Sequence, residues 1–239
     1  MLYLIGLGLN EKGISQQGLE AVKKCKKIYL ENYTVDFPYP LKDLEKVIRK
    51  KIISYSREKV ESLILVEEAR KENIALLIYG SPLTATTHIS LIQEAQKKGV
   101  KCEIIYASSI LNAIAETGLQ LYKFGKIASM PKWQKERNFV PDSFMRIVKE
   151  NQKINAHSLI LIDINLELQE SLKQLEQSAR KNRIKLERIL VCSRLGTKEK
   201  KIIYDEIKNL RSMEIKMPYC IIIPSRLHFI EEEVLKTFS

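Results

Sequence analysis

The chain has 239 residues, of which 45% are hydrophobic and 7% aromatic, so it can bury one large core or two smaller ones and is not of the disordered class. No apolar run approaches the roughly 18 residues of a membrane span, and the N-terminus lacks the basic start and cleavage site of a signal peptide, so we expect a cytoplasmic protein. The net charge of +11 favours an anionic partner, although the lysines are spread over many segments with glutamates between them.

Short apolar runs alternate with amphipathic segments along the first 107 residues, a pattern typical of α/β folds. Ser15 is placed to cap the first helix and Gly99 to end the last one. The expected strands are residues 2–8, 27–31, 51–56, 74–80 and 100–107, and the expected helices are 16–27, 41–51, 59–73 and 86–99.

A second alternation of the same kind begins near Ser108. The sequence therefore predicts two α/β domains, residues 1–107 and 108–239. In the second domain the expected helices are residues 108–118, 144–151, 170–183, 198–212 and 230–238, the expected strands are 126–130, 158–165, 188–196 and 219–225, and residues 131–142 are a polar loop.

The cysteines and histidines do not have the spacing of a metal site, and we expect none. Each cysteine lies in or beside an apolar run, which is typical of a buried thiol. These residues are Cys25, Cys102, Cys192 and Cys220, with His88, His157 and His228.

Three strand-to-helix turns are candidate ligand sites, because ligands of such sheets bind at these turns. The first is GLGLN, where Gly6 and Gly8 permit close backbone approach. Glu31, at the end of the next strand, has the spacing of a residue that holds a ribose in dinucleotide-binding proteins. That fingerprint requires a third glycine where Glu11 stands, so it is not met. A tightly packed turn without a ligand is an equally good interpretation.

The second turn is GSPLTATTH, residues 80–88. Pro82 fixes the backbone, and Thr84, Thr86 and Thr87 offer hydroxyl groups beside free N–H groups at a helix start, which suits a polar ligand group. The same residues could equally form a helix cap. His88 could contact a ligand or be a core histidine with one hydrogen bond.

The third turn is YASS, in which Ser108 and Ser109 stand where one domain gives way to the next. These serines could line a cleft between the domains or only cap a helix that Gly118 ends. The sequence contains no nucleophile elbow, phosphate-binding loop or Ser-His-Asp pattern. It therefore favours either a reaction with little need for acid–base groups or no reaction.

Taken in order, the segments of the chain resemble the diphthine synthases, which belong to the tetrapyrrole-methylase-like class of S-adenosylmethionine-dependent methyltransferases. The resemblance lies in MLYLIGLGL, REKVE, GSPL with ATTH, SSILNAIAETGLQLYKFGK, ILIDI and IIPSRLHFIEEEVL. It implies two αβα domains of the class III methyltransferase type with the cofactor in the cleft between them, and a homodimer. The implied reaction methylates the amino group of a 3-amino-3-carboxypropyl chain on a histidine of translation elongation factor 2. An archaeal-type enzyme would give diphthine, and a eukaryotic-type enzyme would add a methyl ester.

Carried over by position, the resemblance implies contacts to the cofactor from residues of both domains, and it implies no catalytic residue. Ser81 stands where the family usually has aspartate, so we expect cofactor binding to be weaker by ~1–3 kcal/mol, the value of a hydrogen bond to a charged group. The implied contact residues are Leu9, Ser81, Thr84, Ser109, Ile110, Ile162, Leu195 and Tyr219.

Two other functions agree with parts of the sequence. A methyltransferase of the same fold could act on a tetrapyrrole or an RNA, and a basic RNA-binding protein without catalysis would explain the charge. A third possibility is a family member in which Ser81 has abolished activity. The basic surface could also guide docking of the elongation factor, whose side chain carries a carboxylate.

Overall fold

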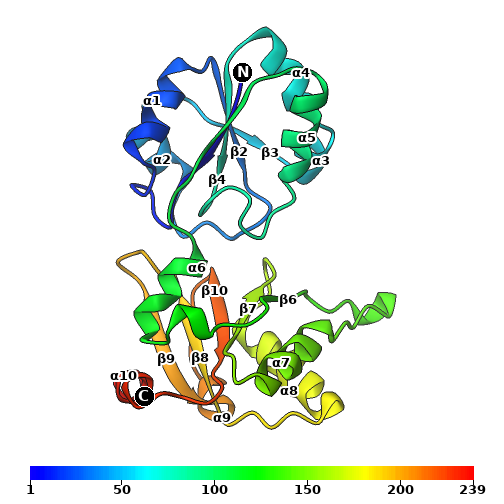
Figure 1. Cartoon of the computed structure of the whole chain (residues 1–239), viewed down its shortest axis with the longest axis vertical. Coiled ribbons are helices and arrows are strands. Elements are labelled where there is room, and N and C mark those ends of the chain that lie inside the picture. Colours follow the sequence, from blue (N-terminus) through cyan, green and yellow to red (C-terminus); the bar gives the residue numbers. More distant parts are fainter. The chain divides into compact units, whose positions relative to one another are not determined.

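The computed structural model describes residues 1–239, which separate into unit 1, Met1–Leu111, and unit 2, Asn112–Ser239 (Figure 1). The expected boundary after residue 107 falls between strand β5 (Cys102–Ile105) and helix α6 (Ile110–Ala113). Each unit contains one five-stranded sheet, and the mixture of helices and strands is the α/β fold that the sequence predicts.

The sheet of unit 1 is entirely parallel, with the strand order β3-β2-β4-β1-β5. Every residue of β1 and β4 is buried, because central strands of a parallel sheet are covered by helices on both faces. The remaining strands are β1 (Leu2–Gly6), β2 (Lys27–Glu31), β3 (Ile53–Tyr55) and β4 (Ile74–Ile78).

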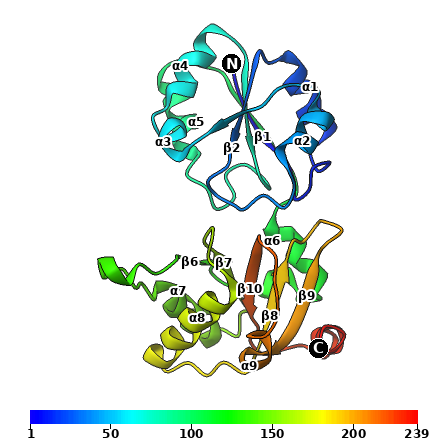
Figure 2. The ribbon, with the colours of Figure 1, turned by 180° about the vertical axis from the view of Figure 1, so that it is seen from behind.

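The helices of unit 1 cover the two faces of its sheet (Figures 1 and 2). One face carries α1 (Gln16–Lys24) and α2 (Leu41–Ile48), and the other carries α3 (Arg57–Glu61), α4 (Ile64–Lys71) and α5 (Ile89–Lys97). The predicted cap is confirmed, since Ser15 Oγ accepts the Gly18 N–H at 3.0 Å. The single helix expected over residues 59–73 is wrong, because Leu63 adopts a left-handed φ of 61° and separates α3 from α4.

The sheet of unit 2 has the order β6-β7-β10-β8-β9, and only β6 and β7 are parallel. Helices α7 (Ser143–Lys153) and α8 (Leu168–Asn182) pack on one face around the fully buried Phe144. The other elements are β6 (Ala128–Met130), β7 (Ser158–Ile162), β8 (Arg188–Ser193), β9 (Lys201–Glu206), α9 (Ile207–Leu210), β10 (Tyr219–Ile223), α10 (Phe229–Lys236) and the 3-10 turns η1 (Ile114–Thr117), η2 (Leu121–Lys123) and η3 (Lys135–Arg137).

The helix expected over residues 198–212 is wrong in its first half, which forms the edge strand β9. Its central run, Ile202 to Tyr204, pairs with β8, and β-branched and aromatic residues favour such pairing. Charged residues at the strand ends, Lys201 and Glu206, are exposed, and charges of this kind protect sheet edges from further pairing. The same charges resemble the polar face of a helix in the sequence.

Three of the four cysteines, Cys25, Cys192 and Cys220, are buried free thiols, as expected, and Cys102 is half-buried. Cys192 and Cys220 lie opposite each other on the neighbouring strands β8 and β10. None of the helices combines the length and the apolar character that crossing a membrane requires.

Candidate functional site

The three turns singled out in the sequence meet at the carboxyl edge of the sheet of unit 1. The Gly8 N–H donates to the Gly80 carbonyl at 3.0 Å, and the Gly80 N–H donates to the Gly8 carbonyl at 2.9 Å. A β-carbon placed on Gly80 would lie 3.7 Å from the β-carbon of Ser109, in the third turn. The turns after β1, β4 and β5 therefore form one continuous backbone surface.

The position of these turns in the sheet is the one at which open α/β folds bind ligands. Strands β1 and β4 are neighbours, yet the chain leaves β1 toward α1 on one face and leaves β4 toward α5 on the opposite face. Adjacent connections that diverge in this way open a crevice between the carboxyl ends of the two strands. Unit 1 therefore has its topological switch point where GLGLN and GSPL are joined.

Close packing explains both glycines of the first turn. A β-carbon on Gly6 would lie 2.7 Å from the Gly80 carbonyl oxygen and 2.9 Å from Pro82 Cδ. Gly8 has a φ of 67°, where L side chains are strained, and its β-carbon would meet Gly13. The tightly packed turn that the sequence left open is thus present, and its packing fixes the floor of the switch point.

Three of the predicted contact residues lie on the first two turns. Leu9 is buried, and its carbonyl oxygen accepts the Tyr79 hydroxyl at 3.1 Å. Ser81 is 8% exposed, and its carbonyl oxygen accepts the Thr84 N–H at 3.2 Å. Thr84 itself is half-buried. The structure brings these three residues to the same edge.

The two predicted residues of the third turn also lie there. Ser109 is buried, and its hydroxyl oxygen accepts the Leu111 N–H at 3.3 Å, which makes it the cap of the short helix α6. Ile110 begins that helix and is half-buried. The capping role that the sequence offered for this turn is therefore confirmed, and the turn lies beside Gly80 at the switch point.

The three predicted residues of unit 2 gather at one end of its sheet. Tyr219 begins β10, Ile162 ends the antiparallel neighbour β7, and Leu195 follows the end of β8, whose Ser193 pairs with Tyr219. Leu195 is buried and Ile162 is half-buried.

The side chain of Tyr219 is part of the core of unit 2. Its hydroxyl lies 2.8 Å from the Leu166 carbonyl oxygen and 2.8 Å from the Ser171 hydroxyl, and burial raises its pKa. Because both Leu166 and Ser171 already contact the hydroxyl group, any contact of Tyr219 with a bound molecule would have to come from its backbone atoms.

Two ionisable side chains beside the switch point are buried. Glu31, which the sequence offered only within an unmet dinucleotide pattern, is fully buried, and burial raises its pKa to about 7. His88 is 1% exposed, and burial lowers its pKa to about 4. Its Nε2 lies 3.5 Å from the Tyr33 hydroxyl, and its Nδ1 has no hydrogen-bond partner. Nothing in the sequence marks Glu31 as buried, because a glutamate at the end of a strand is ordinarily exposed.

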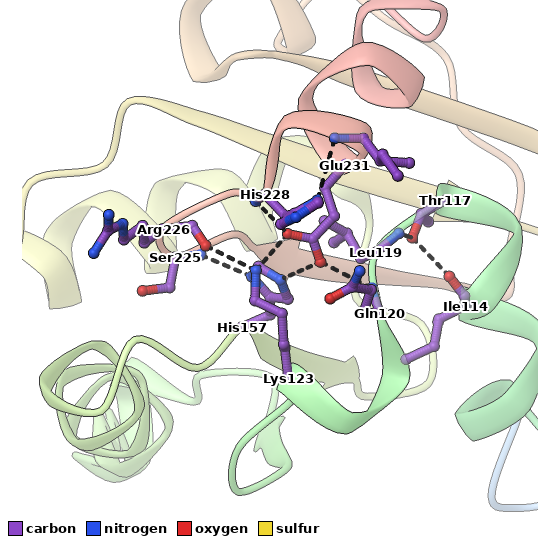
Figure 3. A network of polar contacts seen from close by, with 11 residues as sticks. Ile114, Thr117, Leu119, Gln120, Lys123, His157, Ser225, Arg226, His228 and Glu231 are labelled. Carbon is purple, nitrogen blue, oxygen red and sulfur yellow. Dashed lines mark hydrogen bonds and ion pairs between the residues drawn. The ribbon is translucent and has the colours of Figure 1, made fainter.

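Unit 2 contains a buried polar network that joins the segments TGLQLYKFGK and RLHFIEEE (Figure 3). Glu231 Oε1 accepts the Gln120 N–H at 3.0 Å and lies 3.1 Å from His157 Nε2, while Oε2 accepts the His228 N–H at 2.7 Å and pairs with the Lys123 ammonium group. Burial alone would raise the pKa of Glu231. These donors outweigh it and hold the pKa at about 2.

His157, also fully buried, has a defined tautomer in this network. Its Nδ1 accepts the Ser225 N–H at 3.0 Å, so the ring proton resides on Nε2 and is donated to Glu231. Burial lowers the pKa of His157. The imidazole is therefore neutral, and the network connects residues 117–124 to α10 rather than serving proton transfer. Two of the segments that carry the family resemblance are thus joined by hydrogen bonds and an ion pair within unit 2.

Comparison with known proteins extends over the whole chain. Residues 1–211 match the family model described as Tetrapyrrole (Corrin/Porphyrin) Methylases. The chain is 39% identical to a diphthine synthase of Methanocaldococcus jannaschii, covering 99% of this chain and 98% of that protein. It is 33% identical to a protein of Arabidopsis thaliana named "Probable diphthine methyl ester synthase", covering 100% and 98%. A crystal structure of a diphthine synthase superimposes with a TM-score of 0.90 at 30% identity, covering 100% and 95%.

These relatives share the length of the chain, and the solved structure shares its fold from end to end. The chain therefore belongs to the tetrapyrrole methylase family, in the branch formed by the diphthine synthases.

Proposed function

We propose that the protein is an S-adenosylmethionine-dependent methyltransferase that methylates the amino group of the 3-amino-3-carboxypropyl-histidine of elongation factor 2, giving diphthine. The similarity to diphthine synthases over the full length of both chains carries this proposal. Family membership favours an enzyme over the RNA-binding protein that the charge left open.

The cofactor-binding residues proposed from the sequence suit a sulfonium compound. None of the eight side chains is charged, so none repels the positive sulfur in a protein whose net charge is +11. The hydroxyl groups of Ser81, Thr84 and Ser109 provide neutral hydrogen bonds for the polar parts of the cofactor. The joined turns of Gly8 and Gly80 allow backbone groups to approach it closely.

When bound, S-adenosylmethionine supplies an electrophilic methyl carbon. The task of the chain is to hold an amine in line with that carbon and to exclude water from the crevice. The closely packed backbone of the switch point suits this task, because methyl transfer depends on position more than on acid–base groups.

Transfer of labelled methyl groups to elongation factor 2 that carries the unmethylated side chain tests the proposal. Mass spectrometry of the product should show three added methyl groups on the amine for diphthine, as expected of an archaeal-type enzyme. A further methyl group that base removes would indicate the methyl ester. This product is worth testing because the Arabidopsis relative is named as a probable diphthine methyl ester synthase. An elongation factor without the side chain is the control, and absence of label in both would refute the proposal.

We also propose that the protein works as a homodimer in the cytoplasm. Support comes from large apolar side chains that are exposed on the two segments joined by the Glu231 network. Tyr122 is 82% exposed and Phe229 is 65% exposed, with Leu121 and Ile230 beside them in the sequence. Analytical ultracentrifugation tests this surface as the interface: the wild type should sediment as a dimer and the Tyr122→Lys variant as a monomer.

A further inference from the structure

The two fully buried glutamates of the chain have opposite surroundings. Each carboxylate oxygen of Glu231 has two hydrogen-bonding or ion-pair partners, which offset the cost of burying its charge. Glu31 Oε1 accepts the Thr34 hydroxyl at 2.6 Å, but Glu31 Oε2 has no partner at all. A buried carboxylate oxygen without a partner is costly, so its presence calls for a functional explanation.

Three buried polar atoms without a partner belong to the two segments that meet beside Glu31: Glu31 Oε2, Thr86 Oγ1 and His88 Nδ1. Tyr39 Oη also has no partner, but its ring packs with Phe37 and Tyr79 in the core on the other face of the sheet. The two segments touch through the Tyr33 hydroxyl and His88 Nε2. Such a concentration is what a polar ligand would satisfy.

The charges around Glu31 leave it without a neutralising cation. Arg57 on α3 lowers its pKa by attraction, but this guanidinium lies over the Tyr33 ring at 5.4 Å and pairs with Glu61 at 3.7 Å. No ammonium or guanidinium nitrogen lies within 4.0 Å of the Glu31 carboxylate. His88 is neutral there because of its burial. The Glu31 carboxylate therefore has no direct ion pair within the chain, which makes it a suitable partner for a bound ammonium group.

The cluster adjoins the turns proposed to hold the cofactor. Glu31 ends β2, which pairs with β4 one residue earlier, at Leu30 and Leu77. β4 leads directly into GSPL, and neighbouring strands lie about 4.8 Å apart. Thr86 and His88 belong to the same loop as Ser81. A group bound at Glu31 thus lies within about 10 Å of the switch point.

The geometry points to an acceptor subsite. We propose that Glu31 Oε2 binds the amino group of the aminocarboxypropyl side chain and removes its proton, while the Thr86 hydroxyl and His88 Nδ1–H hold its carboxylate. The subsite rests on the proposed function and names the residues that would receive its substrate. In the required tautomer, His88 Nε2 accepts the Tyr33 hydroxyl, in agreement with their contact.

The proton transfer balances without another reactant. An N–H bond of the ammonium group breaks, its proton forms an O–H bond on Glu31, and the nitrogen keeps the electron pair. That pair forms the bond to the methyl carbon while the methyl–sulfur bond breaks toward sulfur. The carboxylic acid returns its proton to solvent before the next methylation. An α-amino group has a pKa of roughly 8, so a base of pKa about 7 is well matched to it.

Entry of the side chain requires movement of the segment that covers Glu31. Residues 32–40 contain no helix or strand, they connect β2 to α2, and they include Thr34, whose hydroxyl donates to Glu31 Oε1. Their displacement would expose Glu31 without disturbing any strand of the sheet.

Glu31→Gln tests the subsite, because the amide keeps the volume but cannot accept a proton. Binding of elongation factor 2 with the unmethylated side chain would be measured in the presence of S-adenosylhomocysteine at about pH 6 and pH 8. With a pKa of about 7, the ionised fraction of Glu31 rises about tenfold between these values, while an amine of pKa roughly 8 loses about half of its ammonium form. The wild type should therefore bind about fivefold more tightly at pH 8. The variant should lose this pH dependence. Its methyl transfer should fall ~10²–10⁴-fold, while calorimetry should show cofactor affinity changed by less than about twofold.

Matched variants separate the possible outcomes. Glu58→Gln, an exposed residue of α3, should behave like the wild type, and Glu31→Asp should retain the pH dependence at a lower rate. A Glu31→Gln protein with wild-type transfer rates and pH profile would overturn the subsite but leave the proposed function intact. A wild type that transfers no methyl group would instead refute the proposed function. If Glu31→Gln fails to fold by circular dichroism, a pH-independent affinity of the wild type still overturns the subsite.

Discussion

Replacing Glu231 with glutamine removes the charge at the centre of the unit 2 network while keeping the size of the side chain. The carboxylate accepts from the backbone N–H groups of Gln120 and His228 and from the side chains of Lys123 and His157. An amide can offer only its oxygen, so at least two of these donors lose their acceptor. We expect Glu231→Gln to unfold more easily for this reason.

The pKa of Glu231 sets the size of the effect. Its fall from 4.5 to about 2 on folding corresponds to about 3 kcal/mol of stability at neutral pH. Because the folded pKa is the lower one, this stability is present above pH 4.5 and is lost as the pH falls toward 2. The deficit of the variant should therefore be about 3 kcal/mol at pH 7 and roughly half of that or less at pH 3.

Urea titration followed by tryptophan fluorescence is the suitable assay. The only tryptophan, Trp133, lies in unit 2, so its emission reports on the unit that contains the network. Glu232→Gln is the matched control, since Glu232 is exposed and its pairing with Lys236 at 3.7 Å should contribute less than about 0.5 kcal/mol. A deficit below about 1 kcal/mol at pH 7, or one that does not shrink at pH 3, would refute the reasoning.

Three further predictions concern unit 1 and the surface charge. Gly6→Ala should destabilise the protein by about 1–3 kcal/mol and weaken cofactor binding, since its methyl group would press on the Gly80 carbonyl; unchanged thermal melting and calorimetric titration would contradict this. Ser81→Asp should bind S-adenosylmethionine about tenfold more tightly, because a carboxylate can pair with a cationic group of the cofactor; weaker binding by calorimetry would show that account of Ser81 to be wrong. Association with elongation factor 2 should slow as salt rises, because the net charge of +11 is screened; stopped-flow rates that stay flat would exclude steering.

Much of unit 1 could be predicted from the sequence because its buried parallel strands appear there as uniformly apolar runs. Buried runs such as Ile74–Ile78 are apolar throughout, and the carboxyl ends of parallel strands share one edge, so the convergence of the turns at Gly8, Gly80 and Ser109 follows from their order. The sequence pattern of an antiparallel edge strand is weaker, because one edge and part of its faces are open to solvent. The segment Lys201–Glu206 has the charge density of a helix surface, and only its partner β8 determines its conformation.

The polar parts of the structure could not be predicted in the same way. Whether a glutamate is satisfied depends on residues far away in the chain: Glu231 meets Gln120 and His157, whereas Glu31 meets only its sequence neighbours Tyr33 and Thr34. Glu31 ends an apolar strand and Glu231 lies in the first turn of a helix, and neither segment is unusual in sequence. The difference between a structural and an unsatisfied carboxylate arises from tertiary contacts, which composition and spacing do not encode.

The fixed tautomer of His157 has a consequence for solution experiments. With this imidazole held neutral by a backbone donor and Glu231 ionised down to about pH 2, the central pair of the network keeps the same protonation across the physiological range. The net charge of this pair therefore does not change with pH in that range. The effect of this network on stability is therefore confined to acidic pH, where Glu231 takes up its proton.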